Sequence, residues 1–331
     1  MAIALTAAAC GGDDEPTGQP PERDEEAPAE SPSPTPETAE LEWQSLAPAP
    51  SARTEVAAAT DGEQIYVIGG FDESGDGVST VEVYDVAADS WSEGPPLPLA
   101  VNHPMAAALD GEIYLLGGYT QGLGAPTDRA FVLRDGEWEE LPAMPETRAA
   151  GGAAAADGKV YVVGGVVPSG LADSTMVYDP QSDSWSTAPG VPTPREHLGV
   201  ASDGRHVFAV AGRTGGVGTN LSALEAFEPS SEEWEELPDM PSERGGLAAA
   251  ATQEGIVVAP GGEADTTFED VEAFLIDSGT WEELPPLPTP RHGLGVVAVG
   301  KVLYVIAGGP EPGLTFSDAN EAIDLTTLVR S

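Results

Sequence analysis

RTEVAAATDGEQIYVIGGFDESGDGVSTVEVYDVAADSW, residues 53–91, is one unit of a pattern that repeats along the chain and ends at a tryptophan. All six tryptophans of the chain occupy this one position of the pattern: Trp43, Trp91, Trp138, Trp185, Trp234 and Trp281. They are separated by 48, 47, 47, 49 and 47 residues. A period in this range is typical of propellers and solenoids, in which each repeat is one supersecondary unit packed against the next.

Each unit contains four short runs separated by turn residues. In the quoted unit these are the small-residue run VAAAT, the turn Asp61-Gly62, the apolar run IYVIGG, a variable loop, the run VEVYD and the run at the tryptophan. Four such runs predict a four-stranded antiparallel sheet. Asp-Gly is a preferred two-residue hairpin turn, in which both residues adopt positive φ.

Six such sheets arranged around one axis explain the composition of the runs. The first run is built of Ala, Gly and Val, which fit where the innermost strands converge on the axis. The second run is apolar on both faces, as expected of a strand that lies between neighbouring sheets. The sequence therefore predicts an all-β fold, a six-bladed β-propeller.

The last unit predicts how the ring closes. A tryptophan one period after Trp281 would fall at Leu328, so the sixth sheet lacks its outer strand. The segment Leu41-Glu42-Trp43 supplies one such strand and has no sheet of its own. We expect it to pair with the last sheet, because this removes an open strand edge.

The order of these signals resembles the Kelch repeat: Arg, a small-residue strand, hydrophobic-Tyr-hydrophobic-Gly-Gly, Val-Glu-x-Tyr-Asp and Trp. The resemblance covers about residues 41–328. The second repeat departs from it, with Val101-Asn102-His103 where an arginine is expected, and the last three repeats weaken the glycine pair. The resemblance implies a propeller of six or seven blades, and the count here favours six. It does not imply a function, because the same fold hosts adaptors, oxidases and sugar epimerases.

The first ten residues, MAIALTAAAC, are small and apolar and end at the only cysteine. They resemble a bacterial lipoprotein signal peptide, which implies lipidation of Cys10, although they lack a basic start and have Ala7 where leucine is usual. The alternative is an ordinary apolar N-terminus. Residues 11–40 are acidic and rich in proline, which predicts a disordered tether before the propeller at 41–331. We therefore expect a lipid-anchored protein on the extracellular side of the membrane, or a secreted one.

The charge is strongly negative, with 56 Asp and Glu against 13 Lys and Arg. This excludes nucleic acid as a partner, because affinity for phosphates comes from basic residues. An acidic surface that keeps a monomer soluble is the favoured interpretation, and a surface that collects divalent cations is the alternative. No apolar run is long enough to span a bilayer.

Function is expected on the face that carries the long loops after each glycine pair, which we call the loop face, because binding residues concentrate on loops held by a rigid scaffold. Five repeats place an arginine at the inner rim of this face: Arg53, Arg148, Arg195, Arg244 and Arg291. In animal Kelch adaptors arginines at matching positions bind acidic peptides, so the resemblance implies a ring that recognises anions. The favoured alternative is a structural role, in which they pair with loop carbonyls or nearby carboxylates.

Two positions past the arginine lie Glu55, His103 and His197, and His292 lies one position past it. Groups that face a common axis could bind a metal or move protons. Their spacing comes from the repeat rather than from a metal motif, so we interpret them as polar rim residues and predict no metal. No cofactor is predicted either, since the sequence contains no phosphate-binding glycine loop and no nucleophile elbow.

Two functions follow as hypotheses. The first is a surface-anchored module that binds a protein, peptide or glycan, an anionic ligand included, through the loop face. The second is an enzyme acting on an acidic sugar, by resemblance to periplasmic Kelch-type sialic-acid epimerases. In that case Arg195 or Arg291 would hold the carboxylate, and Glu55 or His197 would move a proton. The first is favoured.

Overall fold

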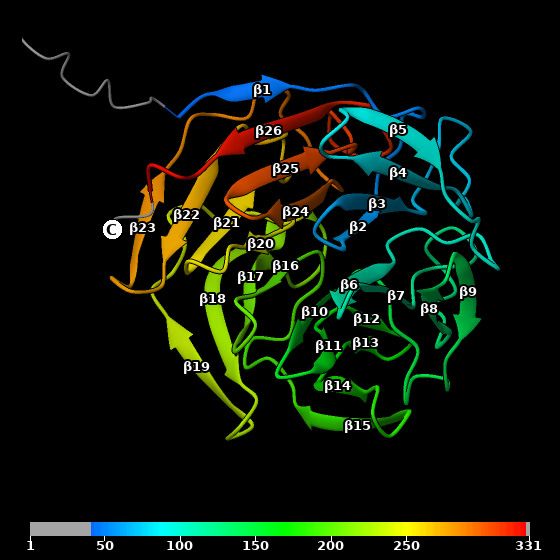
Figure 1. The fold of residues 1–331 in the computed structure, drawn as a ribbon. Coiled ribbons are helices and arrows are strands. Elements are labelled where there is room, and N and C mark those ends of the chain that lie inside the picture. Colours follow the sequence, from blue (N-terminus) through cyan, green and yellow to red (C-terminus); the bar gives the residue numbers. More distant parts are fainter. Residues whose placement is uncertain (1–40, 329–331) are drawn as a thin grey trace, which may run out of the picture. The chain divides into compact units, whose positions relative to one another are not determined.

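The computed structural model describes residues 41–328, which form six four-stranded antiparallel sheets arranged as blades around an axis (Figure 1). The predicted signal segment 1–10 and tether 11–40 lie outside the described residues. The fold is the all-β, six-bladed propeller predicted from the period. Within residues 41–328, no helix is long and apolar enough to cross a membrane.

Each blade contributes one strand to each of four concentric positions. The innermost strands are β2 (Ala57–Thr60), β6 (Met105–Leu109), β10 (Gly152–Ala156), β16 (Gly199–Ser202), β20 (Ala250–Ala251) and β24 (Gly295–Val299). The second strands are β3 (Gln64–Ile68), β7 (Glu112–Leu116), β11 (Lys159–Val163), β17 (Val207–Arg213), β21 (Ile256–Pro260) and β25 (Val302–Ile306). The third are β4 (Val81–Asp85), β8 (Ala130–Arg134), β14 (Ser174–Asp179), β18 (Asn220–Glu228), β22 (Val271–Leu275) and β26 (Asn320–Asp324). The outer strands are β5 (Ser90–Glu93), β9 (Glu137–Glu140), β15 (Ser184–Pro189), β19 (Glu233–Leu237), β23 (Thr280–Glu283) and β1 (Trp43–Ser45).

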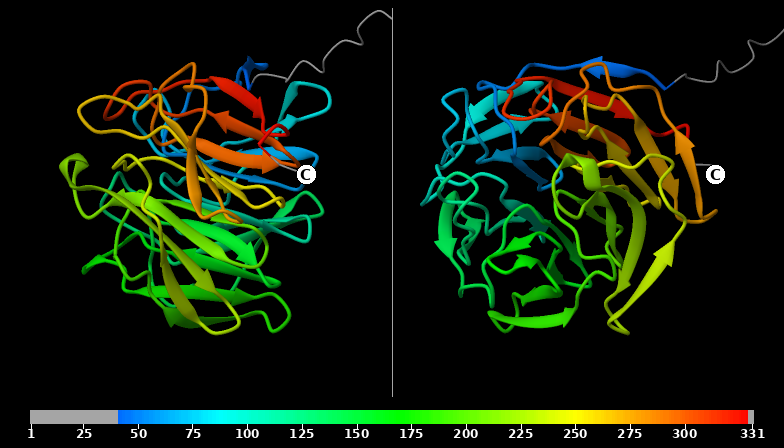
Figure 2. Two further views of the ribbon diagram at one scale, coloured as in Figure 1. Left: turned by 90° about the vertical axis from the view of Figure 1, so that its left-hand side faces the viewer. Right: turned by 180° about the vertical axis from the view of Figure 1, so that it is seen from behind.

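The ring closes as predicted, because β1 is the outer strand of the last sheet. It pairs antiparallel with β26, Trp43 opposite Ile323 and Ser45 opposite Glu321. Figure 2 shows this blue strand running along the red β26. The sheet that begins at β24 therefore has its edge covered by the beginning of the propeller.

The tryptophans join each blade to the one before it. Each indole Nε1 donates a hydrogen bond of 2.8 or 2.9 Å to a backbone carbonyl that follows the previous tryptophan. The six pairs are Trp43–Pro285, Trp91–Ala47, Trp138–Pro95, Trp185–Pro142, Trp234–Pro189 and Trp281–Pro238. Because the indole N–H can only donate, this recurring partner explains why the position is tryptophan in every repeat.

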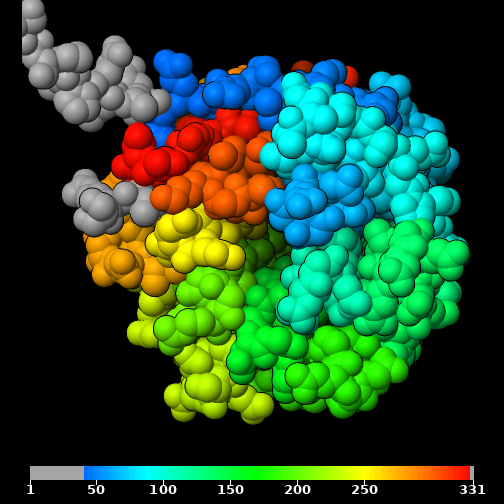
Figure 3. Space-filling view, viewed as in Figure 1, coloured from blue at the N-terminus to red at the C-terminus, as the bar shows by residue number. Residues whose placement is uncertain are grey.

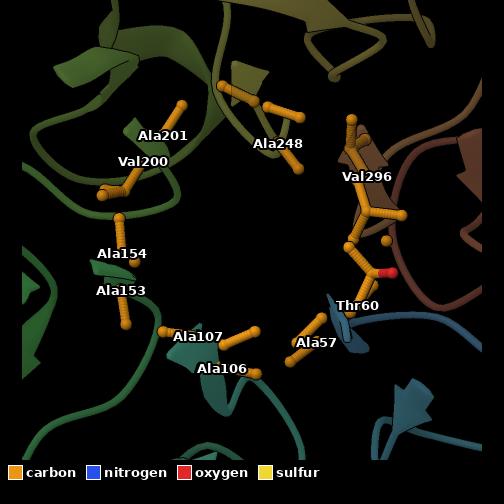
Figure 4. A pocket seen from close by; sticks show the side chains of 18 of the residues that line it. Ala57, Thr60, Ala106, Ala107, Ala153, Ala154, Val200, Ala201, Ala248 and Val296 are labelled. Carbon is orange, nitrogen blue, oxygen red and sulfur yellow. The ribbon is translucent and has the colours of Figure 1, made fainter. Parts of the chain in front are cut away.

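The innermost strands line an axial channel of about 610 Å³ (Figure 4). Its walls are alanine and valine side chains such as Ala57, Ala107, Ala154 and Val200. Small residues are needed where neighbouring innermost strands pack together, since a Cβ on Gly152 would collide with Cγ2 of Val200. The channel is hollowed into the face where the innermost hairpins turn, which Figure 3 shows.

Two of the Asp-Gly hairpins differ from the prediction. Asp110-Gly111 and Asp157-Gly158 have positive φ at both residues, as expected of a two-residue turn. In the first and fourth blades one more residue follows the pair, and Asp61 and Asp203 do not have positive φ. Instead, Oδ1 of Asp61 accepts N–H groups two and three residues ahead, at 2.9 and 2.7 Å. The extra residue therefore changes the turn type without changing the hairpin.

Candidate functional site

The five repeat arginines are buried and do not face the channel or the loops. Their exposed fraction is 1% for Arg53 and 0% for the other four, Arg148, Arg195, Arg244 and Arg291. The predicted anion-recognising ring is therefore wrong as a binding site, because no ligand reaches these guanidinium groups. The structural alternative agrees with the contacts they make.

Arg244 shows the contact that these arginines share. Its guanidinium donates to the carbonyls of Gly261 and Ala259, at 2.7 and 3.0 Å, and to Oε2 of Glu272 at 2.6 Å. The same Arg–Glu pair recurs in four blades, as Arg53–Glu82, Arg195–Glu225, Arg244–Glu272 and Arg291–Glu321. Burial lowers the pKa of each arginine, and the facing glutamate opposes that shift. Each pair thus ties the entry of the innermost strand to the second and third strands of its own blade.

The remaining two blades show how the pair is replaced. In the second blade both members are apolar: Val101 and Phe131 occupy the two positions and lie in one buried cluster. In the third blade Met176 replaces the glutamate, and Arg148 contacts Glu146 instead, at 3.1 Å. The arginine and the glutamate are therefore both present or both absent, except in the third blade. There the arginine is kept and contacts a different glutamate.

A ring of backbone hydrogen bonds surrounds the axis at the loop-face end of the channel. It joins the residues two positions past the arginine, one from each blade: Glu55, His103, Ala150, His197, Gly246 and Gly293. From His103 to Gly293, the N–H of each residue donates to the carbonyl of the one before it, at 2.8–3.1 Å, and the N–H of Val56 closes the ring on Gly293 at 3.3 Å. All six residues have positive φ.

This ring brings together three of the predicted site residues, Glu55, His103 and His197. Each offers a ligand atom, and the three atoms lie within 4.8 Å of one another. His103 Nε2 lies 3.2 Å from Oε2 of Glu55, and its ring packs edge-on against that of His197 with centroids 4.9 Å apart. His292, which directly follows Arg291, also belongs to the cluster, because its Nδ1 lies 3.3 Å from Oε1 of Glu55.

The cluster shifts the ionisation of its members in different directions. Burial lowers the pKa of His103 to about 4, although the Glu55 carboxylate opposes this. The pKa of Glu55 lies well below its usual value, because the surrounding histidines outweigh the effect of burial. Burial alone would lower the pKa of His292, but its contacts with Glu55 and Glu263 raise it.

Three further residues, Glu196, Arg213 and Glu263, complete the cluster, and neither glutamate was singled out from the sequence. Glu196 contacts Nδ1 of His197, and its other oxygen accepts from Nε of Arg213 at 2.9 Å. Arg213 reaches on to Glu263, at 2.9 Å from its Oε1. Glu196 precedes a singled-out histidine, and Glu263 follows the glycine pair where the first two blades have aromatic residues. These positions in the repeat could have identified the two glutamates from the sequence.

The loop face carries exposed apolar side chains. The exposed large hydrophobic residues within residues 41–328 are Leu123, Val217 and Leu314, with exposed fractions of 66, 39 and 54%. All three lie in the long loops after the glycine pairs, and the right-hand view of Figure 2 looks onto these loops. The two arginines of these loops are engaged, Arg129 with Glu140 and Arg213 as described.

The acidic-sugar hypothesis loses its carboxylate-binding step in this geometry. Arg195 and Arg291, which were to hold the sugar acid, are fully buried against Glu225 and Glu321. Glu55 and His197 remain partly accessible, but neither has a basic partner free to orient an anionic substrate among the described residues.

Comparison with known proteins agrees with the repeat architecture. The family model described as the KLHDC2/KLHL20/DRC7 Kelch-repeats domain matches residues 35–190 and 106–309. Among curated proteins, the Kelch-like protein terF of Aspergillus terreus is 41% identical over 71 residues, which cover 20% of this chain and 15% of the relative. Kelch-like protein 35 of Mus musculus is 36% identical over 76 residues, 23% and 13% of the two chains. Kelch repeat and BTB domain-containing protein 12 of Homo sapiens is 32% identical over 90 residues, 24% and 14%. The matches span less than a fifth of the length of these relatives.

Proposed function

Because the chain belongs to the Kelch-repeat family, we propose that it is a protein-interaction module that binds its partner through the loop face. Kelch propellers typically serve this purpose. The placement of the exposed apolar side chains carries the proposal. Leu123, Val217 and Leu314 come from the second, fourth and sixth blades and lie in the loops of one face, where each can serve as an apolar anchor for a partner.

The charge of the loop face defines the partner more closely. Its long loops carry seven exposed carboxylates, at Glu73, Asp76, Asp173, Asp265, Glu269, Glu311 and Asp318. Their two arginines are already paired with glutamates. A complementary ligand is therefore a protein segment with lysine or arginine beside apolar anchors. This replaces the anionic ligand expected from the sequence.

The loops are ordered by contacts with one another. Asn102 Nδ2 donates to the carbonyl of Gly122 at 3.1 Å, and Thr267 Oγ1 donates to that of Pro310 at 2.8 Å. The N–H of Gly313 donates to Oε2 of Glu263 at 3.1 Å. Such preorganisation lowers the entropy lost when a partner binds, which favours a surface that stays ready for docking.

Peptide selection on the full chain tests this function. Peptides selected from a random displayed library are expected to be enriched in Lys, Arg and large apolar residues. The variant Leu123→Ser/Val217→Ser/Leu314→Ser is expected to bind them at least about tenfold more weakly, because it removes the central apolar anchors. These side chains are exposed, so the melting temperature of the variant should stay near that of the wild type.

The control variant changes three exposed residues on the opposite face, Glu63→Ser/Arg205→Ser/Gln253→Ser, and keeps the net charge. It should bind the selected peptides like the wild type. Selection of acidic peptides, or equal binding by the loop-face variant, would contradict the proposal.

We also propose that the module is held at a membrane surface by a lipid on Cys10. The support is the small apolar segment that ends at the only cysteine. In a bacterial host with lipoprotein processing, the full chain is expected in the membrane fraction and Cys10→Ser in the soluble fraction. Equal partition of the two chains would show that Cys10 does not anchor the protein.

A further inference from the structure

We propose that Glu55, His103 and His197 form a binding site for a divalent transition metal ion, with Zn²⁺ as the ion that fits best. Two imidazoles and one carboxylate are the donors of open zinc sites, which keep a further position for water or a ligand. Imidazole also favours zinc over magnesium or calcium, which prefer all-oxygen sites. The inference is independent of the docking surface, since it rests on the ring at the axis and not on the exposed loop residues.

The separations of the donor atoms suit one ion. Nε2 of His103 and Oε2 of Glu55 are 3.2 Å apart, and two ligands of a tetrahedral zinc ion at its usual bond lengths lie about 3.3 Å apart. Nδ1 of His197 is engaged by Glu196, which leaves Nε2 as its donor atom. All three donor atoms lie within 4.8 Å of one another, so small side-chain rotations would complete the site.

The atoms that face away from the site are held by neighbours, as in known metal centres. The contacts are Nδ1 of His103 with Oδ1 of Asn102 at 2.8 Å, Nδ1 of His197 with Glu196, and Oε1 of Glu55 with Nδ1 of His292 at 3.3 Å. Such outer partners fix the tautomer and orientation of ligating histidines. Arg213 in turn donates a hydrogen bond to Glu196, so the residue that orients His197 is itself held in place.

The backbone of the ring holds the three donor residues in the same conformation. The ring requires positive φ, and the fifth and sixth blades meet this with Gly246 and Gly293. Glu55, His103 and His197 adopt φ of 53, 49 and 50° at the same position, and Ala150 adopts 52° there, so the ring imposes this conformation whatever the side chain.

An ion can reach the site. The side chains of Glu55 and His197 are 12 and 11% exposed, and both residues also line the axial channel together with His103. The other three ring positions carry Ala150, Gly246 and Gly293, and a Cβ on Gly293 would lie 2.7 Å from the carboxyl group of Glu55, so glycine is needed where this carboxylate sits. The competing interpretation is a hydrogen-bonded network that holds no ion, and the experiment separates the two.

The test uses the tag-free full chain after removal of metals with a chelator. Calorimetric titration with Zn²⁺ is expected to show one tight site per chain, and the melting temperature should rise on binding. Co²⁺ at the same site should give the visible absorption of a four-coordinate ion. Ca²⁺ and Mg²⁺ should bind only weakly, to surface carboxylates.

The variants His103→Gln, His197→Gln and Glu55→Gln keep side-chain size, and each is expected to weaken Zn²⁺ binding at least tenfold and remove the Co²⁺ absorption. Glu196→Gln should weaken binding about tenfold, since it acts through His197. His206→Gln is the matched control, because His206 also contacts two carboxylates, Asp203 and Glu228, but lies away from the ring. Far-UV circular dichroism without metal checks that each variant is folded. No tight site in the wild type, or unchanged binding in the folded ring variants, would overturn the proposal.

Discussion

Arg291→Val is expected to lower the free energy of unfolding by about 3–5 kcal/mol, because it leaves a buried carboxylate without its charge partner. Arg291 is fully buried, and its Nη1 lies 2.5 Å from Oε2 of Glu321. It also donates to the carbonyls of Val305 and Ala307, both at 2.7 Å. It also donates to the carbonyl of Thr289 at 2.8 Å, so the loss combines an unpaired glutamate charge with three carbonyls that lose this donor. Urea unfolding followed by tryptophan fluorescence measures it.

Adding Glu321→Phe to the same chain is expected to recover about half of that loss. The double variant gives the sixth blade the pair that the second blade already has, Val101 and Phe131. The carbonyl contacts are not restored, so recovery should be partial. Arg205→Ala, which alters an exposed arginine, is the control and should change stability by less than about 0.5 kcal/mol. A single variant as stable as the wild type, or a double variant less stable than the single one, would contradict the structural role of the pair.

Deletion of residues 41–48 is expected to destabilise the propeller by about 5 kcal/mol or more, because it removes the outer strand of the last sheet and leaves β26 with an open edge. The deletion removes β1 and with it the Trp43 Nε1 bond to the carbonyl of Pro285, at 2.8 Å. It also removes the carbonyl of Ala47, which accepts from Trp91 at 2.8 Å and from Asn320 at 3.1 Å. The segment thus joins the sixth blade to the first.

The melting temperature should fall by at least about 10 °C, given the usual relation between stability and melting for a domain of this size. Deletion of residues 11–38 is the control, since it leaves β1 in place. Trp43→Phe should give a smaller loss of about 1 kcal/mol, because it removes the indole N–H and keeps most of the apolar contact. A melting curve that does not change when residues 41–48 are absent would show that the ring does not depend on β1.

The blade count and the closing strand could be predicted because they follow from the period alone. The tryptophan recurs because its N–H has an equivalent carbonyl partner in every blade. Since Leu328 stands where the next tryptophan would fall, the sixth sheet has one outer strand position free for Leu41-Glu42-Trp43. The turns after Thr60 and Ser202 could not be assigned to one type in the same way. They depend on one added residue, whose effect is set by hydrogen bonds of Asp61 and Asp203.

The role of the arginines needed the structure, because the repeat places them at the rim without saying where the side chain points. A guanidinium at the start of the innermost strand can face the axis or turn into its blade, and here it turns toward the glutamate of the third strand. One signal was present in the sequence: the second repeat has lost both Arg and Glu. Read as a pair, Val101 and Phe131 would have favoured the structural role.

The convergence of Glu55, His103 and His197 could be predicted from the sequence, because residues at the same position of each repeat meet at the axis. What the sequence could not supply is the set of partners from other positions. Arg213 and Glu263 reach the cluster from the loop after the glycine pair, and their contacts depend on how the loops fold. The exposure of Leu123 and Leu314 likewise depends on loop conformation.

Hydrogen–deuterium exchange of the full chain, with and without a selected peptide, tests most directly whether the loop face is the docking surface. We expect the peptide to slow exchange in the four loops 71–78, 120–125, 214–219 and 311–316. Exchange in the innermost hairpin turns on the opposite face, such as 61–64 and 253–255, should not change. Protection confined to those turns, or to the outer strands, would contradict the assignment of binding to the loop face.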